Sequence, residues 1–194
     1  MVLPRASSGE LGRNFALVVS ASLLVAACAR WGTFPLPFTP VPFSLQNFAV
    51  LLIGLTLGSR RGAMALVLYL AEGTAGLPVF APTGPGGIAQ LLGPTGGYLV
   101  AYPAVAFLAG WIFERLRGSR AGAFTVALVA GTAGEALLFA SGIAWLKVAA
   151  HLSFPQAAGL AAYPFVACEA LKVTIAAGLA AKKWYPRLRP DENE

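Results

Sequence analysis

The sequence predicts an all-α integral membrane protein, a bundle of six transmembrane helices with both termini in the cytoplasm. Three observations lead to this fold class: the composition, the number of apolar runs, and the segments in which the basic residues lie. Of the 194 residues, 57% are hydrophobic and 11% are charged, and the mean hydropathy is +0.71. A soluble domain carries about 25% charged residues. The composition therefore excludes a soluble globular domain, a disordered chain and a nucleic-acid-binding module, and predicts a multi-pass protein of the cell membrane, in contact with membrane lipid.

The sequence contains six apolar runs, which we interpret as membrane helices. A spanning helix needs about 20 apolar residues, so a chain of this length has room for about six of them with short loops. We expect helices over 14–29, 44–58, 61–75, 97–114, 121–141 and 163–182. The second and third runs are short for a full span. Together the six form one membrane domain, 14–183, between a cytoplasmic N-terminal segment, 1–13, and a cytoplasmic tail, 184–194.

The basic residues orient this bundle. Eleven of the 14 lysines and arginines lie in segments that share one side if there are six spans. They are Arg5, Arg13, Arg60, Arg61, Arg115, Arg117, Arg120, Lys182, Lys183, Arg187 and Arg189. Only Arg30 and Lys147 lie in the opposite loops. Because cytoplasmic loops are enriched in lysine and arginine, this distribution predicts that both termini are inside.

The two longest outer loops have unusual compositions. Residues 31–43 contain prolines at 35, 37, 40 and 42, which exclude a helix and favour extended or polyproline-like backbone. Residues 76–97 are rich in glycine and proline and carry no charge. Irregular backbone at membrane depth is tolerated where it lines a cavity. We therefore expect the second loop to fold back onto the bundle as a lid or a pocket wall, rather than to be an interfacial loop without a ligand.

Two charged residues lie inside the last apolar run. Glu169 and Lys172 are three residues apart, so they share one face of the helix. A charge at the centre of a membrane helix costs about 2.5–3.5 kcal/mol on insertion scales. The pair is either a salt bridge that fixes helix packing or, as we expect, a polar site that faces a cavity. A carboxylate accepts N–H donors, and an ammonium donates to a carbonyl or carboxylate.

The outer loops and the outer half of the last helix can converge on one small-molecule pocket. We expect apolar and aromatic walls from Trp31, Phe34, Phe38, Phe43, Phe80 and Tyr98. The polar groups that orient a ligand are expected to be Thr39, Gln46, Gln90, Glu169 and Lys172.

Other reactive residues support weaker hypotheses. Cys28 and Cys168 have no metal-ligand or CxxC spacing, and His151 has no cluster of partners, so no metal site and no cofactor are expected. Glu72 faces either the pocket or the interface, and Glu135 either bonds a facing helix or is a neutral acid. An intramembrane protease built on Ser141 and His151 lacks an oxyanion motif, and we expect no enzyme.

The first helix carries small residues at helical spacing, in the pairs Ala16 and Ser20, and Ser22 and Ala26. Such faces let a second helix approach closely. They pack either within this bundle or against a separate membrane subunit.

Four motifs, in this order along the chain, resemble the BioY family, the biotin-specific S components of energy-coupling factor (ECF) transporters. They are PLPFTPVPFSLQ (35–46), GLPVF (76–80), the segment 86–103 with GPTGGYL, and EALK (169–172). The resemblance covers about residues 14–183. It implies a six-helix S-component bundle that captures biotin at the outer face with high affinity. It also implies that a transmembrane coupling protein and two cytoplasmic ATPases drive uptake, and a homo-oligomer is possible.

The resemblance also implies roles for individual residues. Glu169 suits the two ureido N–H groups of biotin, and Lys172 either neutralises the valerate carboxylate or bonds the ureido oxygen. Trp31, Tyr98 and the backbone of Gly86, Gly87, Gly96 and Gly97 would enclose the rings, with Thr39, Gln46 and Gln90 nearby.

The sequence departs from some relatives at two positions. Pro85 stands where some carry a polar residue, and Leu99 where some carry a basic one. Backbone groups or Lys172 must then replace those contacts. The alternatives are an S component for another vitamin and a ligand-free scaffold.

Overall fold

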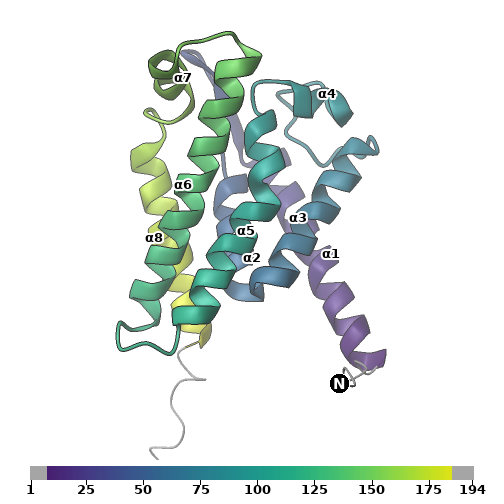
Figure 1. Cartoon of the computed structure of the whole chain (residues 1–194). Helices are drawn as coiled ribbons and strands as arrows, with labels where there is room; N and C mark the ends of the chain where they lie inside the picture. The colour runs from purple at the N-terminus through teal and green to yellow at the C-terminus, as the bar shows by residue number, and fades with distance from the viewer. Residues whose placement is uncertain (1–7, 185–194) are drawn as a thin grey trace, which may run out of the picture.

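The computed structural model describes residues 8–184 as a bundle of helices with one short β-hairpin (Figure 1). The helices are α1 (Ser8–Trp31), α2 (Gln46–Leu57), α3 (Ser59–Thr74), α4 (Gly87–Leu92), α5 (Gly96–Leu116), α6 (Ala123–Ala149), α7 (Phe154–Ala161) and α8 (Val166–Trp184). The strands are β1 (Thr33–Leu36) and β2 (Thr39–Ser44). The six predicted helices correspond to α1, α2, α3, α5, α6 and α8. The fold is thus mostly helical, and the short hairpin in the first loop is the departure from an all-α bundle within the described residues.

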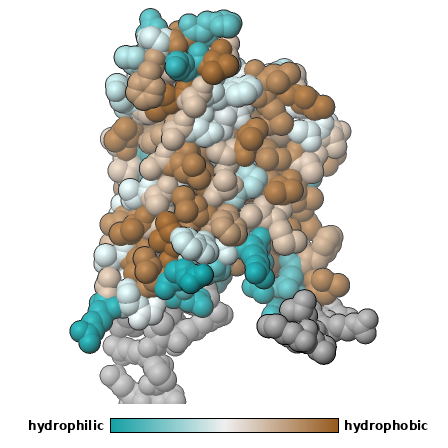
Figure 2. All heavy atoms as spheres, viewed as in Figure 1, coloured by the Kyte–Doolittle hydropathy of each residue, from teal (hydrophilic) through white to brown (hydrophobic). Residues whose placement is uncertain are grey.

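Three helices are long and apolar enough to cross a membrane, within the described residues: α1, α5 and α6. The pair α7 and α8, bent by 54°, passes the same test as one broken span. At 12 and 16 residues, α2 and α3 are shorter than the roughly 20 residues of a straight span. Figure 2 shows a broad hydrophobic band between hydrophilic side chains at the two ends of the visible face.

The hairpin forms because its prolines permit extended backbone and the two strands are both edges. Proline removes a backbone donor, which a two-stranded ribbon tolerates on its outer sides. The strands pair antiparallel, with Thr33 opposite Ser44 and an irregularity between Phe34 and Leu36. The hydroxyls of Thr33 and Ser44 lie 3.0 Å apart, and the Thr39 hydroxyl donates to the Leu160 carbonyl at 2.7 Å. The expected extended backbone is thus present, and Thr39 ties it to α7.

The boundaries of other elements differ from the prediction in two places. The glycine-rich segment 76–97 contains a short helix, α4, and α5 begins at Gly96. The fifth predicted helix continues to Ala149 rather than ending near 141, and α7 forms half of the connection that follows it. In Figure 1, α4 and α7 lie at the same end of the bundle. We call this the pocket end.

The opposite end holds the α2–α3 turn and the α5–α6 loop, and we call it the basic end. Among the described residues it carries Arg13, Arg60, Arg61, Arg115, Arg117, Arg120, Lys182 and Lys183. Arg30 and Lys147 lie in the last turns of α1 and α6, at the pocket end. Arg5, Arg187 and Arg189 lie outside the described residues, as do most of the predicted terminal segments 1–13 and 184–194. The described charges therefore separate between the two ends as predicted.

Glycine lets α2, α3 and α5 pack at close range. A Cβ at Gly54 would lie 2.5 Å from the carbonyl oxygen of Ala106, and one at Gly62 would lie 3.2 Å from the Cα of Gly54. These are backbone atoms, which cannot rotate away. The contact of the three helices fixes α2 and α5, and both of these helices supply side chains to the pocket described below.

Replacing Gly54 by alanine is therefore expected to lower stability, although alanine favours a helix by about 1 kcal/mol over glycine. Overpacking of this kind costs about 1–3 kcal/mol. Gly178→Ala in α8 is the matched control, because a Cβ there meets nothing within 4 Å. Thermal unfolding in detergent should show a lower midpoint for Gly54→Ala and an equal or higher one for Gly178→Ala. A midpoint for Gly54→Ala at or above that of Gly178→Ala would contradict this packing.

Candidate ligand pocket

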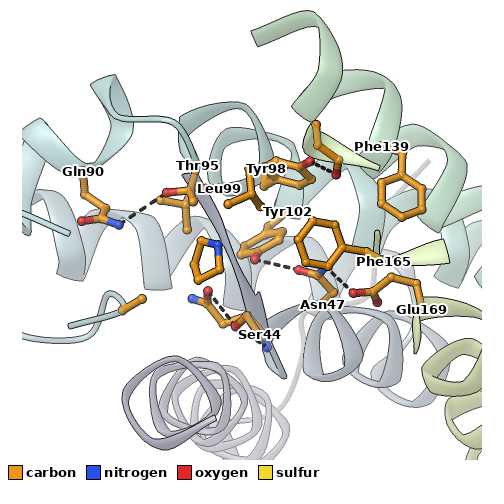
Figure 3. A pocket seen from close by; sticks show the side chains of 15 residues that line it. Ser44, Asn47, Gln90, Thr95, Tyr98, Leu99, Tyr102, Phe139, Phe165 and Glu169 are labelled. Atoms are coloured by element: carbon orange, nitrogen blue, oxygen red, sulfur yellow. Dashed lines mark hydrogen bonds between the residues drawn. The ribbon is translucent and has the colours of Figure 1, made fainter. Parts of the chain in front are cut away.

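A pocket lies at the pocket end, between the hairpin, α2, α5, α6 and α8 (Figure 3). The side chains around it are mostly apolar or aromatic, with a few polar groups among them, as is usual for a small-molecule site. The lining residues are Val41, Pro42, Ser44, Gln46, Asn47, Ala81, Gln90, Thr95, Tyr98, Leu99, Tyr102, Phe139, Ala161, Phe165 and Glu169. Ala81, Gln90 and Thr95 belong to the glycine-rich segment, which thus forms part of the wall.

A buried ion pair lies beside the pocket in the first two turns of α8. The Nζ of Lys172 donates to Oε1 of Glu169 at 2.8 Å and to the Ser44 carbonyl at 2.6 Å. It also lies 4.2 Å from the ring centroid of Phe43, a cation–π distance. Both side chains are buried. Lys172 therefore neutralises Glu169 and holds the end of β2 against α8.

A second chain of hydrogen bonds reaches Glu169 from across the pocket (Figure 3). The Tyr102 hydroxyl donates to the Asn47 amide oxygen at 3.0 Å, and the Asn47 amide nitrogen donates to Glu169 Oε1 at 3.2 Å. Oε1 thus accepts two bonds, whereas Oε2 is buried and has no partner among the described residues. A buried carboxylate oxygen without a donor is costly. The oxygen is available to a ligand donor in the pocket.

Gln90 lines the other end of the pocket. Its amide oxygen accepts the Gly86 N–H at 3.2 Å, and its amide nitrogen donates to the Thr95 hydroxyl at 3.4 Å. Figure 3 places Gln90 and Glu169 on opposite sides of the pocket. A neighbouring groove between the hairpin and the glycine-rich segment shares Pro42, Gln90 and Thr95 with the pocket. The groove therefore leads to the Gln90 side, and Glu169 lies away from it.

Four of the predicted binding residues line the pocket: Gln46, Gln90, Tyr98 and Glu169. Lys172 is one contact away, through Glu169. The Gln46 amide nitrogen donates a hydrogen bond to the Tyr69 hydroxyl at 2.6 Å. The Tyr98 hydroxyl donates to the Ala161 carbonyl. Among the predicted aromatic residues, Phe43 contacts Lys172, and Phe80 packs edge-on against Tyr69.

Other predicted residues lie elsewhere. The side chain of Trp31 is 81% exposed at the end of α1, and Phe34 and Phe38 are also exposed. Thr39 lines the neighbouring groove. The predicted glycines do not line the pocket: Gly86 and Gly87 allow a backbone turn, and Gly96 and Gly97 allow close packing. Gly86 and Gly87 have positive φ at the start of α4, and a Cβ at Gly96 or Gly97 would collide with Leu91 or with Trp145 and Ser141.

Several lining residues were not singled out from the sequence. Asn47 donates to Glu169 and accepts a hydrogen bond from Tyr102, and Phe139 and Phe165 supply aromatic wall. A signal for Tyr102 exists, since it lies four residues after Tyr98 and therefore on the same helix face. Asn47 is a polar residue next to Gln46 in an apolar helix, which is a similar signal.

The small residues of α1 occupy different faces. Ser22 and Ala26 are buried in the bundle, and the Ser22 hydroxyl donates to Glu72 at 2.5 Å. That contact places Glu72 between helices rather than in the pocket. Ala16 and Ser20 are exposed. Of the two pairs, Ala16 and Ser20 are therefore the one accessible to a separate subunit.

Two further features bear on the chemistry. Both carboxylate oxygens of Glu135, in α6, are buried without a hydrogen-bond partner in residues 8–184. No group of three or more histidine, cysteine, aspartate or glutamate side chains that could hold a metal ion occurs in that range.

Comparison with known proteins identifies the family. The model of the BioY family matches residues 5–188. The chain belongs to the BioY family. A Thermotoga maritima protein described as biotin transporter BioY is 34% identical over 163 residues, which are 84% of this chain and 92% of that protein. A Rhodobacter capsulatus protein of the same description is 37% identical over 183 residues, covering 88% and 92% of the two chains.

A solved structure has the same fold. The crystal structure of the S-component for biotin from an ECF-type ABC transporter superposes with a TM-score of 0.83, at 22% identity, over 95% of this chain and 96% of that one. Membership of the family, whose relatives are biotin transporters, and the apolar helices agree that the chain is a multi-pass protein of the cell membrane.

Removing the ammonium of Lys172 should destabilise this BioY chain strongly. Lys172→Met leaves the Glu169 carboxylate buried without its counter-charge, and breaking a buried pair costs about 3–5 kcal/mol. Replacing both residues by methionine should recover part of this loss. Lys147→Met, at an exposed lysine of α6, is the control and should change stability by less than about 0.5 kcal/mol. Thermal unfolding in detergent measures all four proteins, and a Lys172→Met midpoint equal to wild type would refute the pairing.

Proposed function

We propose that this protein is the biotin-binding subunit of a vitamin uptake transporter and that it captures biotin in the pocket beside Glu169. The observation that carries the proposal is the unpartnered Oε2 of Glu169, a buried acceptor on the wall of a mostly apolar pocket. Biotin carries two ureido N–H donors on a compact ring system, which complements this acceptor. The names of the relatives, biotin transporters, support the same ligand.

The ion pair supports a particular orientation of the ligand. Lys172 is already bound to Glu169 and Ser44, so the Glu169 end of the pocket carries no net positive charge for a carboxylate. The ureido ring therefore lies at Glu169 and Asn47, with the valerate chain toward Gln90 and the neighbouring groove. Leu99 is apolar on the pocket wall, so the carboxylate is bound by polar groups of the Gln90 side and not at that position.

The apolar part of biotin suits the remaining wall. Tyr98, Tyr102, Phe139 and Phe165 surround the space between the two polar ends. Aromatic side chains supply large contact surfaces to ring systems. In this assignment Trp31, Gly86, Gly87, Gly96 and Gly97 shape or flank the site without enclosing the ring, and no residue has a catalytic role.

The membrane topology belongs to the same proposal. We assign six spans to α1, α2, α3, α5, α6 and the bent pair α7–α8, with both termini in the cytoplasm. The basic end then faces the cytoplasm, as the positive-inside rule requires, and the pocket faces outward. In a chain with Cys28 and Cys168 replaced by alanine, Arg120→Cys should react with an impermeant maleimide only after the membrane is opened. Reaction in intact cells would refute this orientation.

Transport itself is assigned to partners. We propose that a transmembrane coupling protein and two cytoplasmic ATPases work with this chain. Among the small residues of α1, Ala16 and Ser20 face outward and are the ones available to the coupling protein. Ser22 and Ala26 instead pack within the bundle. Unchanged co-purification of the coupling protein with Ala16→Trp would exclude this face.

A homo-oligomer is a separate proposal. Light scattering of the purified chain tests it by measuring the mass of the particle.

Glu169→Gln should weaken biotin binding, because the amide keeps the size of the side chain but loses the charge. A hydrogen bond to a charged group contributes about 1.5–3 kcal/mol, which is about 10–150-fold in affinity. Glu72→Gln is the matched control, since Glu72 lies on α3 and bonds Ser22 outside the pocket. Isothermal titration calorimetry of biotin into the purified chain measures both variants.

The result also distinguishes the competing functions. Equal biotin affinity in Glu169→Gln and wild type, with both folded by circular dichroism, would remove Glu169 from the site. Absence of saturable biotin binding to the wild-type chain would refute biotin capture. A parallel titration with thiamine, riboflavin and pantothenate then identifies another vitamin or shows a scaffold without a ligand.

A further inference from the structure

A second groove lies at the basic end, far from the biotin pocket, between the start of α3 and the end of α5. Arg60 and Arg61 line it from α3, and Phe107, Trp111, Glu114 and Arg115 line it from α5. The two helices run antiparallel and pack against each other, so these residues meet at one end of the bundle. No part of the proposed biotin site lies in this groove.

The groove carries an excess of positive charge. Arg60, Arg61 and Arg115 are all exposed, and within residues 8–184 neither Arg60 nor Arg61 forms an ion pair. Glu114 is the carboxylate on this groove, and both of its oxygens are engaged at the start of α3. Oε1 accepts the Ser59 N–H at 3.0 Å, and Oε2 accepts the Ser59 hydroxyl at 2.7 Å. The arginines are therefore left to bind an external anion.

Above the arginines, both helices present apolar side chains to the surroundings. On α5, Phe107, Trp111 and Arg115 recur every four residues and form one stripe, and the Arg115 guanidinium lies 5.6 Å from the centroid of the Trp111 ring. On α3, Met64 and Val67 follow Arg60 on the same face, and both are more than half exposed. The apolar stripe extends about 12 Å from Arg115 to Phe107 at 1.5 Å per residue.

This arrangement has the order of groups found in a phospholipid. Arginines lie where the helices end, and apolar side chains continue from them toward the hydrophobic band of Figure 2. A small soluble anion would use the arginines but not the stripe, and an apolar partner helix would use the stripe but leave the arginines unpaired. Basic pockets between membrane helices are known to bind anionic headgroups.

We propose that this groove binds an anionic phospholipid, with its phosphate at Arg60, Arg61 and Arg115 and its acyl chains along Met64, Trp111 and Phe107. Phosphatidylglycerol is the probe for this class. The lipid would fill the space between the start of α3 and the end of α5 and hold the first turn of α3 at the membrane surface. This inference does not depend on biotin being the ligand of the pocket.

Native mass spectrometry of the full chain in detergent, titrated with dioleoyl phosphatidylglycerol against dioleoyl phosphatidylcholine, tests the proposal. Arg60→Gln/Arg115→Gln should weaken phosphatidylglycerol binding by about fivefold per arginine. Arg120→Gln/Lys182→Gln removes two exposed charges of the same end outside the groove and should leave the affinity within about twofold. Trp111→Ala should also weaken binding, since it removes the apolar wall and keeps every charge.

The remaining outcomes distinguish a phospholipid from a soluble anion or a protein partner as the occupant of the groove. Inorganic phosphate and glycerol 3-phosphate at equal phosphate concentration should not displace the lipid, and displacement would show a simple anion site and overturn the proposal. Equal losses in the groove variant and the charge-matched control would show unspecific attraction. Unchanged lipid binding in the groove variant, with loss of coupling-protein co-purification, would assign the groove to a protein partner instead. Because the three arginines are exposed, the arginine variants should keep the wild-type unfolding midpoint. Arg61→Gln alone removes one charge and should give a smaller loss of lipid affinity.

Discussion

The ion pair between Lys172 and Glu169 is the interaction on which the pocket depends. A membrane bundle keeps two charges at its interior at a lower cost when they neutralise each other and when other hydrogen-bond partners are present. Lys172 meets both conditions by donating to Glu169 and to the Ser44 carbonyl. The lysine therefore joins two parts of the chain that are 128 residues apart, and it positions the wall of the pocket as well as its polar end.

The same pair explains how a nearly uncharged site can recognise a polar ligand. Asn47 and Lys172 both donate to one oxygen of Glu169, which leaves the other oxygen as an acceptor with no donor among the described residues. A neutral ring with N–H donors, such as the ureido ring of biotin, satisfies this oxygen without bringing a new charge to this end of the pocket. A ligand carboxylate would gain little at this end, because the ammonium of Lys172 is already paired with Glu169. The proposed orientation of biotin follows from this difference between the two ends of the pocket.

The polar end of the pocket and the basic end of the bundle could be predicted from the sequence, because charged residues are rare in it. Glu169 and Lys172 are conspicuous inside an apolar run, and the basic residues mark one end of the bundle. Side-chain direction was harder to predict. Trp31 continues α1 with its ring turned outward, and the residues of the pair Ser22 and Ala26 lie six positions after those of Ala16 and Ser20, on a different face at 3.6 residues per turn. The hairpin pairs through Thr33 and Ser44, a contact that proline spacing does not specify. Asn47 needs its neighbours Tyr102 and Glu169 in space before its role is apparent.

A crystal structure of the chain with biotin bound would test the central claim most directly. The account predicts that a ureido nitrogen lies within hydrogen-bonding distance of the second carboxylate oxygen of Glu169, that Lys172 still contacts Glu169, and that the valerate chain points toward Gln90. Biotin bound in the reverse orientation, with its carboxylate at Lys172, or bound outside the pocket, would contradict it.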